Sequence, residues 1–129
     1  MSATELPQEP ASSPASFPNT LRLKHNREFQ RVYAERRSVS DSVLLIFGTR
    51  NDRDVTRLGL SVSRKVGAAV RRNRWKRLIR ESFRTQRHVL PMGLDLVVIP
   101  RAAVLPSAMV VRRSLRDLIL RLDRRLSQT

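Results

Sequence analysis

The sequence predicts one small domain that combines α-helices with β-strands. Three stretches repeat apolar residues at helical spacing, and four others are apolar runs or alternate apolar with polar residues, as strands do. The two kinds of pattern interleave along 129 residues, a length typical of a single domain with a small core. The expected fold class therefore mixes helix and sheet.

The first twenty residues predict a disordered tail. They hold four of the seven prolines, two glutamates and no lysine or arginine. Such a segment cannot bury enough apolar surface to offset the entropy lost on ordering. The folded domain is expected over residues 21–127.

The segment after the tail predicts a short helix over about residues 26–36. Asn26 is the predicted N-cap, because its side-chain oxygen can accept a hydrogen bond from the exposed amides of a first helical turn. Phe29, Val32 and Tyr33 then recur at helical spacing.

Three strands are expected next. Residues 38–41 predict a short edge strand and residues 43–47 an unbroken apolar strand, followed by a polar loop over residues 48–54. Residues 58–63 alternate strictly, so their apolar side chains share one face. The opposite, flat and polar face carries Gly59, Ser61 and Ser63. It either faces water in a half-solvated sheet or accepts a ligand.

The stretch from Ala68 to Arg87 predicts an amphipathic helix with an unusual charge. Its apolar core stripe consists of Trp75, Leu78, Ile79 and Phe83. A basic row at i+4 spacing consists of Arg72, Lys76, Arg80 and Arg84. Between Arg64 and Arg87 there are ten basic residues and one acid, a net +9 within a whole-chain charge of +15. A solvated structural helix normally intersperses acids, so this surface predicts a polyanion site, with nucleic acid the leading partner.

The remaining residues predict a central strand and a final helix. Residues 94–99 are apolar and β-branched, and Pro100 ends the strand. Ser107 is the predicted cap of the last helix. That helix should dock through one stripe formed by Leu115, Leu118, Ile119, Leu122 and Leu126.

Several kinds of chemistry have no support in the sequence. There is no cysteine, so disulfides, thiolate zinc sites and thiol nucleophiles are excluded. His25 and His88 are too far apart to form a helical metal-binding pair, and the acids are scattered rather than clustered for Mg²⁺. No apolar run approaches the ~20 residues that span a bilayer, and no signal-peptide pattern occurs. A cytoplasmic binding protein without a membrane partner or a dedicated metal site is expected.

Two stretches resemble the bacterial ribonuclease P protein component. One is residues 58–67 followed by 69–81, which contains the family's Arg-Asn-Arg helix motif, and the other is residues 23–33. The resemblance covers about residues 22–122. It implies an α+β fold in which a four-stranded sheet packs against helices in the order α-β-β-β-α-β-α. It also implies a left-handed crossover through the Arg-Asn-Arg helix, against the usual right-handed preference.

The resemblance also implies a function. In that family the partner RNA and its Mg²⁺ ions are the catalyst, and the protein helps to bind precursor tRNA and remove its 5′ leader. The chain would then be the protein subunit of a tRNA-processing endoribonuclease. Its partners would be ribonuclease P RNA and precursor tRNA, with no obligate protein partner implied.

Two binding surfaces follow from the resemblance. The residues that would contact the catalytic RNA are Arg72, Asn73, Arg74, Lys76, Arg77 and Arg80. Those that would receive the single-stranded leader are Phe29, Tyr33, Ser61, Ser63, Arg64 and Lys65. The alternative for the two aromatic residues is plain core packing. Trp75 is assigned to the core. Ala68 stands where relatives often have Asn, so Ser63 or backbone groups are expected to cap the helix instead.

Two other functions are weighed against this one. A ribosomal or general RNA-binding protein would carry the same positive charge but take no part in cleavage. A protein-only nuclease would cleave RNA without a catalytic RNA.

Overall fold

The computed structural model describes residues 17–102 and 104–128. In chain order the main elements are α1 (Asn26–Ala34), β1 (Ser38–Ser40), β2 (Leu44–Arg50), β3 (Arg57–Leu60), α2 (Ala69–Gln86), β4 (Leu94–Pro100) and α3 (Ala108–Ser127). Short 3₁₀ turns are η1 (Asn19–Leu21), η2 (Arg64–Val66) and η3 (Arg87–Val89). The predicted order of helices and strands is confirmed.

The strands form one mixed sheet in the order β1-β2-β4-β3. β1 pairs with β2 and β2 with β4 in antiparallel fashion, whereas β3 and β4 are parallel neighbours joined through α2. The α+β class with a four-stranded sheet is therefore confirmed. The left hand of the crossover stays a prediction.

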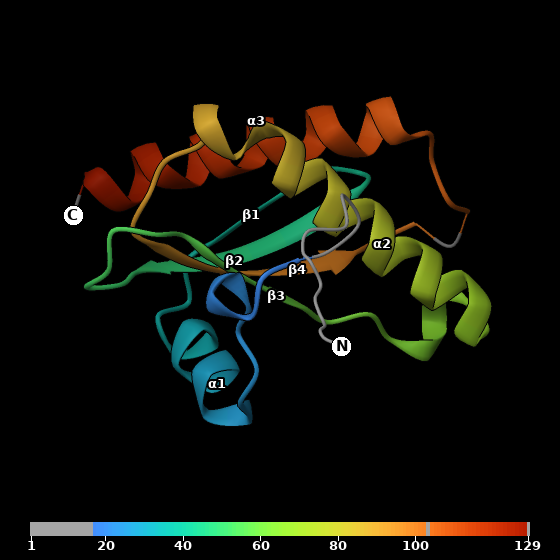
Figure 1. Cartoon of the computed structure of the whole chain (residues 1–129), viewed down its shortest axis with the longest axis horizontal. Coiled ribbons are helices and arrows are strands. Elements are labelled where there is room, and N and C mark those ends of the chain that lie inside the picture. The colour runs from blue at the N-terminus through green and yellow to red at the C-terminus, as the bar shows by residue number, and fades with distance from the viewer. Residues whose placement is uncertain (1–16, 103, 129) are drawn as a thin grey trace, which may run out of the picture.

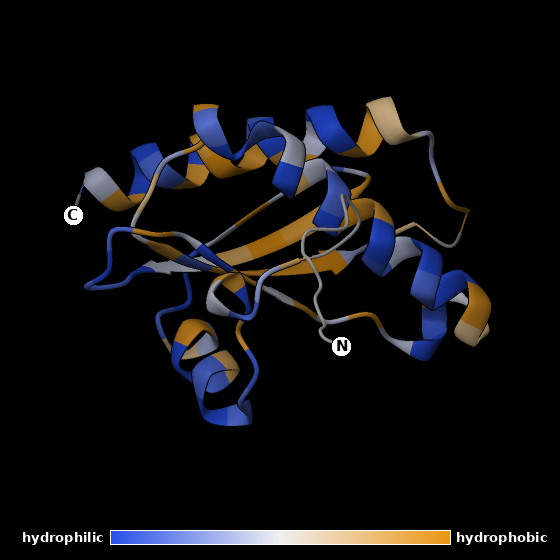
Figure 2. Cartoon of the chain, in the orientation of Figure 1, coloured by the Kyte–Doolittle hydropathy of each residue, from blue (hydrophilic) through white to orange (hydrophobic). Residues whose placement is uncertain are grey.

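The main core lies between one face of the sheet and the two long helices, α2 and α3 (Figure 1). Trp75 is fully buried, as predicted, and packs in the same cluster as Ile79 and Phe83 of α2. The predicted leucine stripe of α3 lies in that cluster too, where Leu115 and Leu122 are fully buried. Figure 2 shows the apolar sides of both helices turned towards the apolar sheet. Each such side chain contributes about 1.5–3 kcal/mol by leaving water.

The other face of the sheet is covered by α1 (Figure 1). Val32 is the one fully buried residue of this short helix, and it packs with Leu23 and Val97. Phe29 and Tyr33 pack around this small cluster and are half-buried. The two layers are therefore unequal, with most of the apolar burial on the α2 and α3 side.

The first helix begins and ends differently from the prediction. His25 is its N-cap and Asn26 its first residue. Glu28 explains this start, since its Oε1 accepts the backbone N–H groups of Lys24 (3.0 Å) and His25 (3.1 Å). The helix ends at Ala34, because Arg36 has a φ of +56°, in the left-handed region.

Strand β2 runs through part of the predicted loop at residues 48–54. Gly48 belongs to the strand and is buried, because Leu122 of α3 and Leu96 of β4 pack directly over it. A Cβ at Gly48 would lie 2.5 Å from Leu122 Cδ2. The glycine therefore provides space for a close approach instead of marking a turn.

The folded domain begins a few residues earlier than predicted. Residues 1–16 of the predicted tail lie outside the described residues, but Phe17 is buried against Phe83, with ring centroids 5.9 Å apart. η1 follows directly and buries Leu21. A large aromatic ring and a short turn thus order residues that proline content alone assigned to the tail. No helix within the described ranges is long and apolar enough to cross a membrane.

Candidate nucleic-acid interface

The outward side of α2 presents the basic residues that the sequence singled out. Because the stripe through Trp75 and Ile79 faces the core, a half-buried row and an exposed group are left on the outside. The half-buried row is Arg72, Lys76 and Arg80, and the exposed group is Asn73, Arg74 and Arg77. None of these side chains takes part in an ion pair within the described ranges. Their charge is thus available to a partner.

One end of the basic row is neutralised within the helix. Arg84 forms an ion pair with Glu81, at 2.6 Å between Nη2 and Oε2. Arg80 lies in a different environment, since burial, with a smaller contribution from nearby Arg22, lowers its pKa. Arg22 belongs to the segment before α1, so cationic side chains from two parts of the chain meet at this end of the row.

The start of α2 lacks a side-chain cap. Ala68 is its N-cap residue and makes no capping hydrogen bond. Ser63, which the sequence offered as a substitute, caps η2 instead, since its hydroxyl accepts the Lys65 N–H at 3.3 Å. Gly67 separates the two elements with a φ of +129°, a conformation that favours glycine. The first turn of α2 therefore begins without a side-chain hydrogen bond from its N-cap residue.

The aromatic residues of α1 are both packed and accessible. The Tyr33 ring meets Phe47 of β2 edge-on, with centroids 5.1 Å apart and planes at 90°. Phe29 lies over Gly59 of β3, where a Cβ would be 2.7 Å from the ring. Both aromatic residues remain half-buried, so each is anchored by the sheet and keeps part of its surface exposed.

The polar residues predicted for the leader follow β3. Gly59, predicted on the flat polar face that meets either water or a ligand, is buried beneath the Phe29 ring. Ser61 is half-buried, and its N–H continues the strand pairing by donating to the Val98 carbonyl at 3.1 Å. Ser63, Arg64 and Lys65 are exposed in and beside η2. The predicted leader residues therefore come from two places, α1 and the exit of β3.

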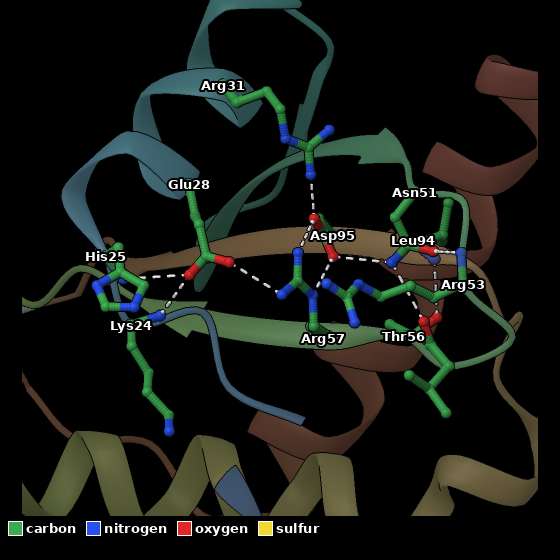
Figure 3. Close-up of polar contacts among 11 residues, drawn as sticks. Lys24, His25, Glu28, Arg31, Asn51, Arg53, Thr56, Arg57, Leu94 and Asp95 are labelled. Atoms are coloured by element: carbon green, nitrogen blue, oxygen red, sulfur yellow. Dashed lines mark hydrogen bonds and ion pairs between the residues drawn. The ribbon is translucent and has the colours of Figure 1, made fainter. Parts of the chain in front are cut away.

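A polar network that the sequence interpretation missed connects α1 to the sheet (Figure 3). Arg57 of β3 lies opposite Asp95 of β4 in the parallel pair, and its Nε and Nη2 donate to the two carboxylate oxygens at 2.9 and 2.7 Å. Its Nη1 donates to Glu28 of α1 at 2.9 Å. Arg31 of α1 also pairs with Asp95, and Asn51 donates to it at 2.8 Å. The fully buried carboxylate of Asp95 thus ties β3, α1 and the loop after β2 to strand β4.

The network shifts the titration of Glu28. Its pKa is lowered from 4.5 to about 2, chiefly by the hydrogen bond from the Lys24 N–H. Burial opposes this shift, and the hydrogen bond from the His25 N–H and the charge of Arg57 add to it. The side chain therefore stays charged and fixes the start of α1 on β3. A signal for this network was present in the sequence, because Asp95 interrupts an apolar central strand and a buried carboxylate requires a partner.

Metal-ligating side chains do not gather in the described ranges. No group of three or more His, Asp or Glu residues lies close enough together there to hold an ion. Glu28 and Asp95 instead accept hydrogen bonds from arginines.

Comparisons with known proteins find a matching family model and relatives of similar sequence. The family model for ribonuclease P matches residues 17–123. The ribonuclease P protein component of Thermotoga maritima is 42% identical over 86 residues, covering 67% of this chain and 74% of that protein. Its counterpart in Clostridium kluyveri is 44% identical over 104 residues, covering 78% and 93%.

Solved structures show the same fold. The RNase P protein of Thermotoga maritima superposes with a TM-score of 0.72 at 37% identity, covering 78% of this chain and 96% of that one. The Staphylococcus aureus RNase P protein gives 0.70 at 34% identity, covering 80% and 94%.

Proposed function

Because the chain belongs to the ribonuclease P protein family, we propose that it assists a catalytic RNA in removing the 5′ leader from precursor tRNA. In this role the protein is part of an endoribonuclease, and the RNA, with the Mg²⁺ it holds, performs the cleavage. The protein contributes binding surfaces and positive charge.

The observation that carries this proposal is the unpaired basic row on α2. Arg72, Lys76 and Arg80 follow one another along the helix without an acidic partner in the described part of the chain. Like charges at this spacing repel and cost a few tenths of a kcal/mol per pair in an isolated helix. A polyanion removes that repulsion, and the planar guanidinium can grip a phosphate through two hydrogen bonds.

We assign the catalytic RNA to α2. Asn73, Arg74 and Arg77 are exposed beside the half-buried row, so the helix offers direct contacts together with a broad positive field. Neutralised phosphates repel one another less, which lets RNA strands approach closely and favours Mg²⁺ held by the RNA.

We assign the leader to the α1 side of the sheet. Single-stranded RNA needs aromatic surfaces for stacking beside charge, with roughly 1–3 kcal/mol per stacked base. Tyr33 and Phe29 are anchored by the sheet with part of each residue exposed, and Arg64 and Lys65 are exposed beyond β3. Packing against the sheet and stacking with a base are compatible for such rings.

Cleavage of precursor tRNA by a bacterial ribonuclease P RNA at low Mg²⁺ tests the proposal. The purified chain should stimulate cleavage and should cleave nothing alone. If cleavage is not stimulated, the alternative of a general RNA-binding protein is favoured. Cleavage by the chain without the RNA would indicate a protein-only nuclease.

Variants of α2 test the assignment of the catalytic RNA. The double change Arg72→Ala plus Lys76→Ala should flatten the dependence of log affinity on log salt by about 1.8, since each phosphate contact contributes about 0.9. The matched control, Arg113→Ala plus Arg116→Ala, removes two exposed arginines of α3. An unchanged slope in the first variant would remove those two residues from the RNA surface.

A variant of α1 tests the assignment of the leader. Tyr33→Ala should weaken binding of precursor tRNA by the holoenzyme much more than binding of mature tRNA, which has no leader. Equal losses for both would limit Tyr33 to packing against Phe47.

A further inference from the structure

A small polar pocket lies where the segment before α1 meets the loop between β2 and β3. Its volume is about 230 Å³. The residues around it are polar or charged and include Asn19, Thr20, Arg22, Lys24, His25 and Arg53. Neither of the two predicted surfaces includes any of these six residues.

The charges around this pocket do not cancel. Glu28 and Arg57 also line it, but Glu28 is paired with Arg57, and Arg57 is paired with Asp95 as well. Both oxygens of Glu28 are occupied, one by two backbone N–H groups and the other by Arg57. The remaining cations, Arg22, Lys24 and Arg53, form no ion pair within the described residues.

The Arg22 side chain is held by an aromatic ring and makes no side-chain hydrogen bond within the described part of the chain. Its guanidinium lies over the Phe17 ring, 5.7 Å from the ring centroid. Its Nε is buried and has no hydrogen-bond partner among the described residues. Stacking on an aromatic ring fixes the orientation of the guanidinium. Because Arg22 lines the pocket, its terminal N–H groups are the donors for a ligand there.

The pocket also adjoins the α2 surface. Arg22 stacks on Phe17, whose ring packs against Phe83 of α2, so the segment before α1 lies beside that helix. The charge of Arg22 also contributes to the lowering of the Arg80 pKa. From there Lys24 and Arg53 extend the positive surface around the pocket. An RNA strand bound on α2 would thus find further cations at the pocket.

We propose that this pocket binds a phosphate group of an RNA backbone through Arg22, Lys24 and Arg53, and that it joins the α2 surface to the α1 surface. The inference rests on the proposed function, because it takes RNA as the partner. The phosphate can belong to ribonuclease P RNA or to precursor tRNA. Measuring the affinity for each RNA separately distinguishes these two sources.

The test neutralises two exposed cations, Lys24→Gln plus Arg53→Gln. The backbone N–H of Lys24 that holds Glu28 is unaffected by a change of side chain. The matched control is Arg113→Gln plus Arg116→Gln on α3. Affinity is measured from 50 to 200 mM salt for ribonuclease P RNA with the protein alone and for precursor tRNA with the holoenzyme, and thermal unfolding checks that each variant folds.

We expect the log affinity slope of the double variant to flatten by about 1.4–1.8 for one of the two RNAs, since each phosphate contact contributes roughly 0.7–0.9. Over this fourfold range of salt, its affinity should therefore fall roughly 7- to 12-fold less than that of the wild type. The RNA that shows the change is the one that supplies the phosphate. A third variant, Arg22→Gln, should lower the affinity for that same RNA.

The proposed phosphate site would be overturned if the double variant folds and its salt slopes match those of the control for both RNAs. If the wild type still stimulates cleavage in that case, the proposed function stands. A wild type that fails to stimulate cleavage would overturn the proposed function, and the pocket inference with it.

Discussion

The strongest prediction for stability concerns Asp95 at the centre of the network between α1 and the sheet. Asp95→Asn keeps the size of the side chain but removes its charge. Arg57, whose side chain is only 10% exposed, would then be a buried cation without its two-point carboxylate partner. Breaking a buried pair in this way costs about 3–5 kcal/mol. Since whole domains are stable by only about 5–15 kcal/mol, this is a large fraction of the total.

Thermal and urea unfolding followed by circular dichroism measure this loss. A decrease of 3 kcal/mol corresponds to a melting temperature lower by at least about 12 °C in a domain of this size. Asp117→Asn is the matched control, because Asp117 is exposed on α3 and forms no ion pair in the described residues. If Asp95→Asn were as stable as Asp117→Asn, the network would not hold the fold together.

Two further predictions concern neighbouring residues. Because the Glu28 pKa is about 2 in the folded chain and 4.5 ordinarily, its stabilisation is complete above about pH 4.5 and is lost as the pH falls towards 2. The full shift corresponds to about 3 kcal/mol, which solvent screening reduces to roughly 1–2. When the free energy of unfolding is measured against pH, Glu28→Gln should lack this part of the acid-induced loss of stability. A pH profile identical to that of the wild type would exclude Glu28 as the source of that loss. Gly59→Ala would place a methyl group 2.7 Å from the Phe29 ring, so it should cost about 1–3 kcal/mol and lower the preference for precursor over mature tRNA. An unchanged preference would separate the position of Phe29 from leader binding.

The long helices could be predicted because their apolar stripes are regular. The stripe from Trp75 to Phe83 extends over about two turns of α2. The Ser107 hydroxyl accepts the Val110 N–H at 3.3 Å, as its predicted capping role requires. Short elements gave weaker signals. Gly48 resembled a loop residue because the close approach of Leu122, which requires it, comes from a helix more than seventy residues later.

The polar network could be predicted only in part. Asp95 within an apolar strand shows that a cationic partner must exist, but 26 lysines and arginines were available. Arg57 is selected by the parallel register of β3 on β4, and Arg31 by the placement of α1. Both depend on tertiary pairing that local sequence does not encode. The pocket at Arg22 and Arg53 depends on the same pairing, since its residues come from segments far apart in the chain.

The unequal layers on the two faces of the sheet have a consequence for the motions of the domain. α1 buries one residue completely, whereas α2 and α3 bury many, so detaching α1 exposes far less apolar surface than global unfolding does. The backbone amide hydrogens of α1 should therefore exchange with solvent through a local opening. Those of α2 and α3 should exchange only when the whole domain unfolds. If the leader binds α1 as proposed, it would oppose that opening, so part of its binding free energy would go into holding α1 on the sheet.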